Sequence, residues 1–296
     1  MHTLKNDKLK IAIENIGAEL CEISSVKHNT QFMWDANPDV WGSFAPNLFP
    51  VIGALKNGSL TFEGETYNTP RHGFIRHSKD ITLYNKTDNS LTFKLKSNAE
   101  LLKIYPFKFE FLITFTLTNN TLNVSHTVKN TDTKTMYFSL GGHPAFKCPV
   151  FENEAYDDYF LEFEHKENSS RYLIELGSGL ILNETEPVFN NDNILPLKHE
   201  LFDVDALVFK DLKSRKISIN SKNHGKILTV SYPKFNYMGI WAKPNGDYVC
   251  IEPWLGIADS VNASGNLKEK EGILSLKAGS AFEASYSIEI EDKHLV

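Results

Sequence analysis

The feature that most constrains the fold is an alternation of apolar and polar residues with a period of two, which recurs along most of the chain. The clearest run carries apolar side chains at Phe107, Phe109, Phe111, Ile113, Phe115 and Leu117. Asn119 and Asn120 mark a turn, and the alternation resumes at Leu122 and Val124. Because successive side chains of a strand point to opposite faces, this stretch predicts an antiparallel hairpin with one buried face.

Shorter alternating segments follow as far as residues 282–290, and long amphipathic helices are scarce. The frequent turns and short connections favour a large antiparallel β-sandwich with few short helices over a fold of alternating strands and helices. No linker, repeat or shift in composition divides the sequence. We therefore predict an all-β protein with a single domain over residues 1–296.

Composition excludes several classes of function. The net charge is −6 and no Lys/Arg-rich block stands out, which argues against a nucleic-acid partner. The three cysteines, Cys21, Cys148 and Cys250, are too sparse for a disulfide framework or a zinc motif. The start lacks an apolar signal core, and no run is long enough to span a bilayer. We expect a cytoplasmic protein without a membrane partner, as a monomer or homodimer.

A carboxylate near the C-terminal end is the first residue that could carry chemistry. Tyr248, Cys250 and Glu252 fall on one face of an alternating run, and Pro253 follows at once. Since proline has no N–H for the ladder, we expect the strand to end there, with Glu252 at the mouth of a cleft. A solvated glutamate at a strand terminus is the commoner alternative.

Two histidines lie in segments rich in glycine and proline. His72 is on a loop between Arg71 and Arg76, which suits a sugar oxygen or a phosphate, although an exposed basic loop is the better explanation of this motif alone. His143 lies between two glycines and Pro144, which is a poor context for a residue that only fills the core. His126, in contrast, alternates with apolar residues and is expected in the core.

Four segments, in their order along the chain, resemble the aldose 1-epimerase (galactose mutarotase) superfamily. They are Arg71–Phe74, Gly141–Phe146, Asp205–Phe209 and Ile251–Asp259. The resemblance covers nearly the whole chain and is greatest to the bacterial galactose mutarotase-related branch, near the hexose-6-phosphate mutarotases. It implies a large antiparallel β-sandwich with a sugar cleft on one sheet face, and no metal or redox cofactor. The implied reaction interconverts the α and β anomers of an aldohexose or hexose phosphate.

The resemblance also implies roles for three residues. Glu252 matches the general base and His143 the general acid, while His72 matches a second histidine that holds the sugar and polarises its ring oxygen. We expect an ionised Glu252 and a protonated His143 on opposite sides of the hemiacetal. A pair of groups that differ in protonation state predicts a bell-shaped pH profile.

Other residues would bind substrate. Asp205 matches a hydroxyl-binding aspartate, although capping or solvation is the better explanation from the residues alone. Arg71 and Arg76 match basic loop positions of the phosphosugar relatives, and Trp254 could stack on the sugar or fill the core. One departure is Ala54, where relatives often carry a sugar-binding arginine. Its loss leaves a second hypothesis open, a carbohydrate-binding or sensory protein without efficient chemistry.

Other enzyme classes find less support. The sequence contains no H-E-x-x-H zinc motif, no G-x-S-x-G elbow and no P-loop. A glycosidase needs two carboxylates that flank the scissile bond, and Glu252 with Asp205 could form such a pair. That third reading would leave His72 and His143 without a role.

Overall fold

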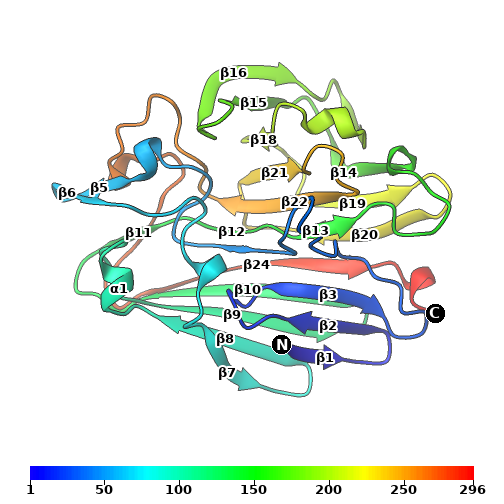
Figure 1. Ribbon diagram of the computed structural model, residues 1–296, viewed down its shortest axis with the longest axis horizontal. Coiled ribbons are helices and arrows are strands. Elements are labelled where there is room, and N and C mark those ends of the chain that lie inside the picture. Colours follow the sequence, from blue (N-terminus) through cyan, green and yellow to red (C-terminus); the bar gives the residue numbers. More distant parts are fainter.

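Two large antiparallel sheets form the molecule, as the alternation predicts, in a computed structural model that describes all residues 1–296 (Figure 1). The first sheet has nine strands. In order across the sheet they are β17 (Asp192–Pro196), β14 (Tyr159–Glu167), β19 (Lys216–Ser221), β20 (Gly225–Ser231), β24 (Ala281–Ile290), β10 (Thr121–Asn130), β9 (Phe109–Thr118), β8 (Ser90–Lys96) and β7 (Thr82–Lys86).

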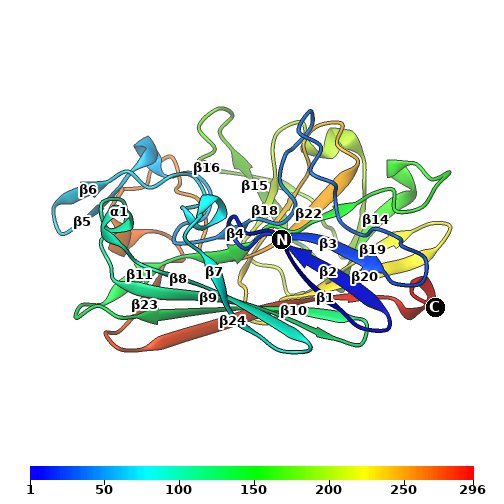
Figure 2. The same cartoon turned by 60° about the horizontal axis from the view of Figure 1, so that its bottom comes forward.

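The second sheet has eight strands. In order they are β16 (Ile181–Pro187), β15 (Ser170–Ile174), β18 (Leu207–Phe209), β21 (Tyr237–Trp241), β22 (Tyr248–Leu255), β12 (Leu140–Gly142) and β4 (Asn47–Leu48), and β13 (Ala145–Lys147) also pairs with β22. Figure 2 shows the two sheets as layers, with β9, β10 and β24 below and β18 and β22 above.

Smaller elements complete the fold. The remaining strands are β1 (His2–Lys5), β2 (Leu9–Ile13) and β3 (Leu20–Ser25) in one sheet, the hairpin β5 (Leu60–Phe62) and β6 (Glu65–Tyr67), and the pair β11 (Met136–Phe138) and β23 (Leu274–Leu276). The only α-helix, α1 (Ala99–Leu102), has four residues. Single 3-10 turns occur at Lys56–Gly58, Ile75–His77, Tyr156–Asp158, His199–Phe202, Leu267–Glu269 and Asp292–His294. No helix is long and apolar enough to cross a bilayer.

The apolar faces of the two sheets meet in one core of 72 buried residues. The predicted hairpin forms β9 and β10, which pair from Thr118–Thr121 at the turn to Phe109–Asn130. Buried and partly buried residues alternate along both strands. Phe49, which follows β4, stacks on Phe111 of β9 with ring centroids 4.6 Å apart. This packing fixes the second sheet on the first.

A buried polar contact also joins the sheets. His126 of β10 is fully buried, and its Nε2 lies 3.0 Å from Oδ1 of Asn47 in β4. The Asn47 amide donates to the carbonyls of Gly17 and Ala18, both at 3.1 Å. Burial lowers the pKa of His126 to about 4, so it is a neutral core residue, as its place in the alternation predicts.

The expected end of β22 at Pro253 is wrong, because the strand continues to Leu255 and every residue of it is buried. The N–H of Ile251 donates to the carbonyl of Pro144 at 3.2 Å. Backbone donors alternate between the two edges of a strand, so the nitrogen of Pro253 points to that same edge. There the chain passes from β12 to β13 without regular pairing, so the missing N–H breaks no continuous ladder.

Candidate active site

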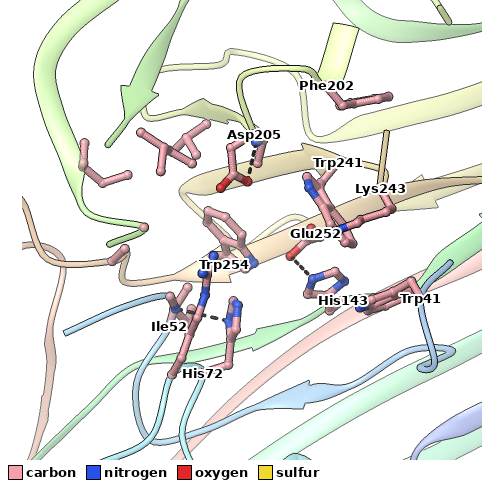
Figure 3. A pocket seen from close by; sticks show the side chains of 18 of the residues that line it. Trp41, Ile52, His72, His143, Phe202, Asp205, Trp241, Lys243, Glu252 and Trp254 are labelled. Atoms are coloured by element: carbon pink, nitrogen blue, oxygen red, sulfur yellow. Dashed lines mark hydrogen bonds and ion pairs between the residues drawn. The ribbon is translucent and has the colours of Figure 1, made fainter. Parts of the chain in front are cut away.

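His143 and Glu252 are direct neighbours across two strands. β12 and β13 pair with the same edge of β22, through Gly141 opposite Trp254 and Ala145 opposite Cys250. This single register places His143 opposite Glu252, with both side chains on one face of the sheet (Figure 3). His143 Nε2 lies 3.2 Å from Glu252 Oε2. Residues distant in sequence are therefore held in contact by rigid strands.

Small residues on the neighbouring strands make room for Trp254. A Cβ at Gly239 of β21 would lie 2.5 Å from Cζ2 of the Trp254 indole, and one at Gly141 would lie 2.8 Å from its Cδ1. The indole consequently lies across both glycines and forms part of the cleft lining. Gly142 faces the opposite side, where a Cβ would lie 2.7 Å from the ring of Tyr286. Packing thus explains both glycines that precede His143.

A cleft of about 720 Å³ opens above this face. Its volume falls within the roughly 300–1,000 Å³ that is usual for small-molecule sites. All the predicted site residues line it, namely Arg71, His72, Arg76, His143, Asp205, Glu252 and Trp254. The structure therefore brings together in one cavity residues that the sequence spreads over most of the chain.

His72 is held by reciprocal contacts with Gly53. The His72 N–H donates to the Gly53 carbonyl at 3.0 Å, and the Gly53 N–H donates to His72 Nδ1 at 3.2 Å. Since Nδ1 accepts, the ring proton of a neutral His72 is on Nε2. Burial lowers the pKa of His72 well below its ordinary value, and the nearby His143 lowers it further. His72 is thus a neutral donor, with its ring centroid 5.7 Å from that of His143.

The burial of Glu252 and His143 opposes the ionised glutamate and protonated histidine that we expected. Burial raises the pKa of Glu252 well above its ordinary value, although Trp254, Arg71 and Arg76 oppose this. The Trp254 Nε1–H group lies near the Glu252 carboxyl group and lowers its pKa, but it makes no well-formed hydrogen bond. Burial and Arg76 lower the pKa of His143 to about 3. Both shifts have the same main cause, since burial disfavours the charged form of each group.

The two groups also do not lie on opposite sides of a substrate position, as we expected from the sequence. They are 3.2 Å apart and face the cleft together. The two oxygens of a hemiacetal are bonded to the same carbon, so adjacent groups on one side can serve both. The geometry therefore corrects the expected placement and remains suited to a paired proton transfer.

Arg71 lies beside Ala54, the position where an arginine was expected. A Cβ at Gly179 would lie 2.9 Å from Arg71 Nη1 and 3.4 Å from Ala54 Cβ. The guanidinium of Arg71 therefore passes close to Ala54, and both residues border the hairpin between β15 and β16. A cationic donor is present at this wall of the cleft although the residue at position 54 is alanine.

Asp205 and Arg76 have different surroundings. Asp205 has a positive φ of 77°, and its carboxylate accepts the Ala206 N–H at 2.7 Å while it faces the cleft (Figure 3). It therefore combines the capping and cleft positions that the sequence left open. Arg76 Nη2 lies 3.4 Å from Ser43 Oγ, and its charge interacts with Glu19 and Glu252. Arg76 is partly buried, and its positive charge lies close to the Glu252–His143 pair.

The comparison with known proteins assigns the family. The model of the family described as aldose 1-epimerase matches residues 1–289. The chain belongs to the aldose 1-epimerase family.

Relatives of this epimerase support the assignment along the whole chain. The plasmid-encoded protein LacX of Lactococcus lactis subsp. lactis is 34% identical over 97% of this chain and 98% of its own. A galactose mutarotase related enzyme from Lactobacillus acidophilus is 36% identical, with a TM-score of 0.93 over 98% of this chain and 97% of its own. A galactose mutarotase-like protein from Lactobacillus casei is 30% identical, with a TM-score of 0.91 over 98% and 100%.

Sequence reasoning missed two tryptophans of the epimerase cleft. Trp41 stacks on the His143 ring at 5.0 Å and 25°, and Trp241 meets that ring edge-on at 5.8 Å. The loop that carries Trp41 is fixed by Glu19, which accepts the N–H groups of Phe44 and Ala45. For Trp41, the available signal was an aromatic residue in a loop rich in Asn, Asp and Pro, since tryptophan outside a regular element often serves binding.

Proposed function

We propose that this epimerase interconverts the α and β anomers of an aldohexose or its phosphate by proton transfer through Glu252 and His143. The observation that carries the proposal is the buried pair, 3.2 Å apart, within a cleft that can hold a monosaccharide. Ring opening of a hemiacetal requires a base within reach of the C1 hydroxyl and an acid within reach of the ring oxygen.

In the forward step the Glu252 carboxylate takes the proton of the C1 hydroxyl, and the His143 imidazolium gives a proton to the ring oxygen. The bond between C1 and the ring oxygen breaks, which leaves an open-chain aldehyde, a protonated Glu252 and a neutral His143. Rotation about C1–C2 and reversal of both transfers give the other anomer. Each positioned transfer contributes about 10²–10⁴-fold in rate.

The neutral pair reaches the starting state of this cycle by moving one proton from Glu252 Oε2 to His143 Nε2, which are 3.2 Å apart. The pair carries one proton before and after ring opening, and only its position between the carboxylate and the imidazole changes. The state after opening, with both groups neutral, is the one that burial favours. The low-dielectric site thus stabilises the intermediate state relative to the ion pair. His72, as a neutral donor, would bind the ring oxygen or a neighbouring hydroxyl.

The polar lining of the cleft is mixed in charge, which supports a sugar as ligand. Arg71, Arg76 and Lys243 supply cations, and Asp203 and Asp205 supply carboxylates. Carboxylates and arginines bind hydroxyl groups as acceptors and donors. The arginines could also bind a phosphate, which arginine recognises in a bidentate manner. We therefore propose that the cleft accepts both free and phosphorylated hexoses.

The test is anomer exchange measured by NMR or polarimetry with fresh α-glucose, α-galactose and their 6-phosphates. The proposal expects exchange faster than the uncatalysed rate for at least one sugar, and loss of that acceleration in Glu252→Gln. A tighter complex with a 6-phosphate that weakens in Arg71→Ala would assign the phosphate to the arginines. Binding without faster exchange would favour the alternative, a carbohydrate-binding protein without chemistry.

A further inference from the structure

Cys250 lies next to the Glu252–His143 pair and has no part in the proposed mechanism. It is two residues before Glu252 on β22, so both side chains are on the same face of the sheet. Cys250 is fully buried, and it does not line the cleft. One ligand atom each from His143, Cys250 and Glu252 lie within 4.8 Å of one another. The three side chains thus form a compact cluster with its open side toward the cleft.

We infer that His143, Cys250 and Glu252 bind a thiophilic divalent metal ion such as Zn²⁺, and that the bound ion blocks the acid/base pair. Zinc binds thiolate sulfur at about 2.3 Å and imidazole nitrogen at about 2.0–2.1 Å in tetrahedral geometry. Such a geometry puts neighbouring ligand atoms roughly 3.3–3.7 Å apart. The Nε2–Oε2 distance of 3.2 Å is just below this range. The sulfur has to approach by about 1 Å to complete the set.

The charges also fit a buried divalent ion. On binding, the Cys250 thiol and the Glu252 carboxyl group release their protons to water. The resulting thiolate and carboxylate balance two positive charges, and a neutral imidazole adds none, so the occupied site is neutral and avoids the cost of a buried net charge. Glu252 Oε2 is buried and has no well-formed hydrogen bond, although His143 Nε2 is nearby. A metal ion supplies the partner that this oxygen lacks. The fourth coordination position faces the cleft, where water or a sugar hydroxyl completes the tetrahedron.

Binding is tested with Co²⁺, which replaces Zn²⁺ and absorbs in the near ultraviolet when a thiolate binds it. The full chain is titrated as wild type, Cys250→Ser and Cys21→Ser, because Cys21 is a free and more exposed thiol in the separate β1–β3 sheet. We expect one equivalent of thiolate-bound Co²⁺ in the wild type and in Cys21→Ser, and none in Cys250→Ser. His143→Asn removes a second ligand and should also abolish the signal.

A signal that persists in Cys250→Ser, or no thiolate signal in the wild type, would overturn the inference. The blocking effect rests on the proposed function and is measured separately. Zn²⁺ should reduce anomer exchange by at least tenfold, with recovery on addition of a chelator, and Cys250→Ala should remove this sensitivity. A Co²⁺ signal in a protein without exchange activity would refute the proposed function and leave the metal site standing. Exchange activity that Zn²⁺ does not affect would refute the block.

Discussion

Replacement of Gly239 by alanine tests how the sheet positions the cleft lining. The added Cβ would lie 2.5 and 2.6 Å from Cζ2 and Cη2 of Trp254, where ordinary carbon contacts are about 3.5–4.0 Å. The indole must therefore retreat by about 1 Å, and Gly141 limits its movement on the other side. Overpacking of this kind costs about 1–3 kcal/mol. Because Glu252 pairs directly with Gly239, we also expect anomer exchange to slow by about 10²-fold.

Urea unfolding and polarimetry measure the two effects. Gly42→Ala is the matched control, since its nearest neighbour, Pro38 Cα, is 3.7 Å from the new Cβ, and it should change stability by less than about 0.5 kcal/mol. In a Trp254→Leu background the clash is absent, so Gly239→Ala should cost much less. An equal cost in both backgrounds, or a Gly239→Ala variant as stable and as active as wild type, would refute the packing argument.

Three further predictions follow from burial and charge. The pKa of Glu252 is raised in the folded state, so the stability of the wild type falls as pH rises from about 4.5 toward that folded pKa. Glu252→Gln should lose this dependence. In urea unfolding, the stability of the variant relative to wild type should therefore increase between pH 5 and pH 8. Arg71→Ala should raise KM by roughly ten- to a hundredfold with a smaller change in kcat, because hydrogen bonds from a charged donor contribute about 1.5–3 kcal/mol; an unchanged KM would remove Arg71 from the sugar site. Lys270→Met leaves the buried Asp259, 2.6 Å from the Lys270 ammonium, without its cation and should destabilise the fold by about 3–5 kcal/mol. A variant that unfolds at the same urea concentration as wild type would contradict this.

The local pattern of the sequence predicts the strands of this protein well. The alternation around Phe111 and Val124 depends only on which face of a strand is buried, and the hairpin β9–β10 forms where it indicates. The prediction fails at Pro253 because whether a strand can contain proline depends on the segment that lies beside it in the sheet. The opposing segment contains Pro144, and no sequence rule for a single strand includes that partner.

The residues that line the cleft together could be named from the sequence as candidates, but their arrangement could not be predicted. Contact between His143 and Glu252 depends on the register between strands that are far apart along the chain. The shifts of their pKa values follow from burial, which a motif does not report. Trp41 lies on a loop without periodicity, so its stacking on His143 is visible only in the fold.

The most direct test of the central claim is anomer exchange of α-glucose, measured by NMR for wild type, Glu252→Gln and His143→Asn at equal sugar saturation. The account predicts exchange by the wild type well above the uncatalysed rate, and a loss of at least about 10²-fold in each variant. Sugar binding, measured by calorimetry, should survive in Glu252→Gln. Wild-type exchange in either variant would contradict a mechanism in which the buried pair transfers the protons.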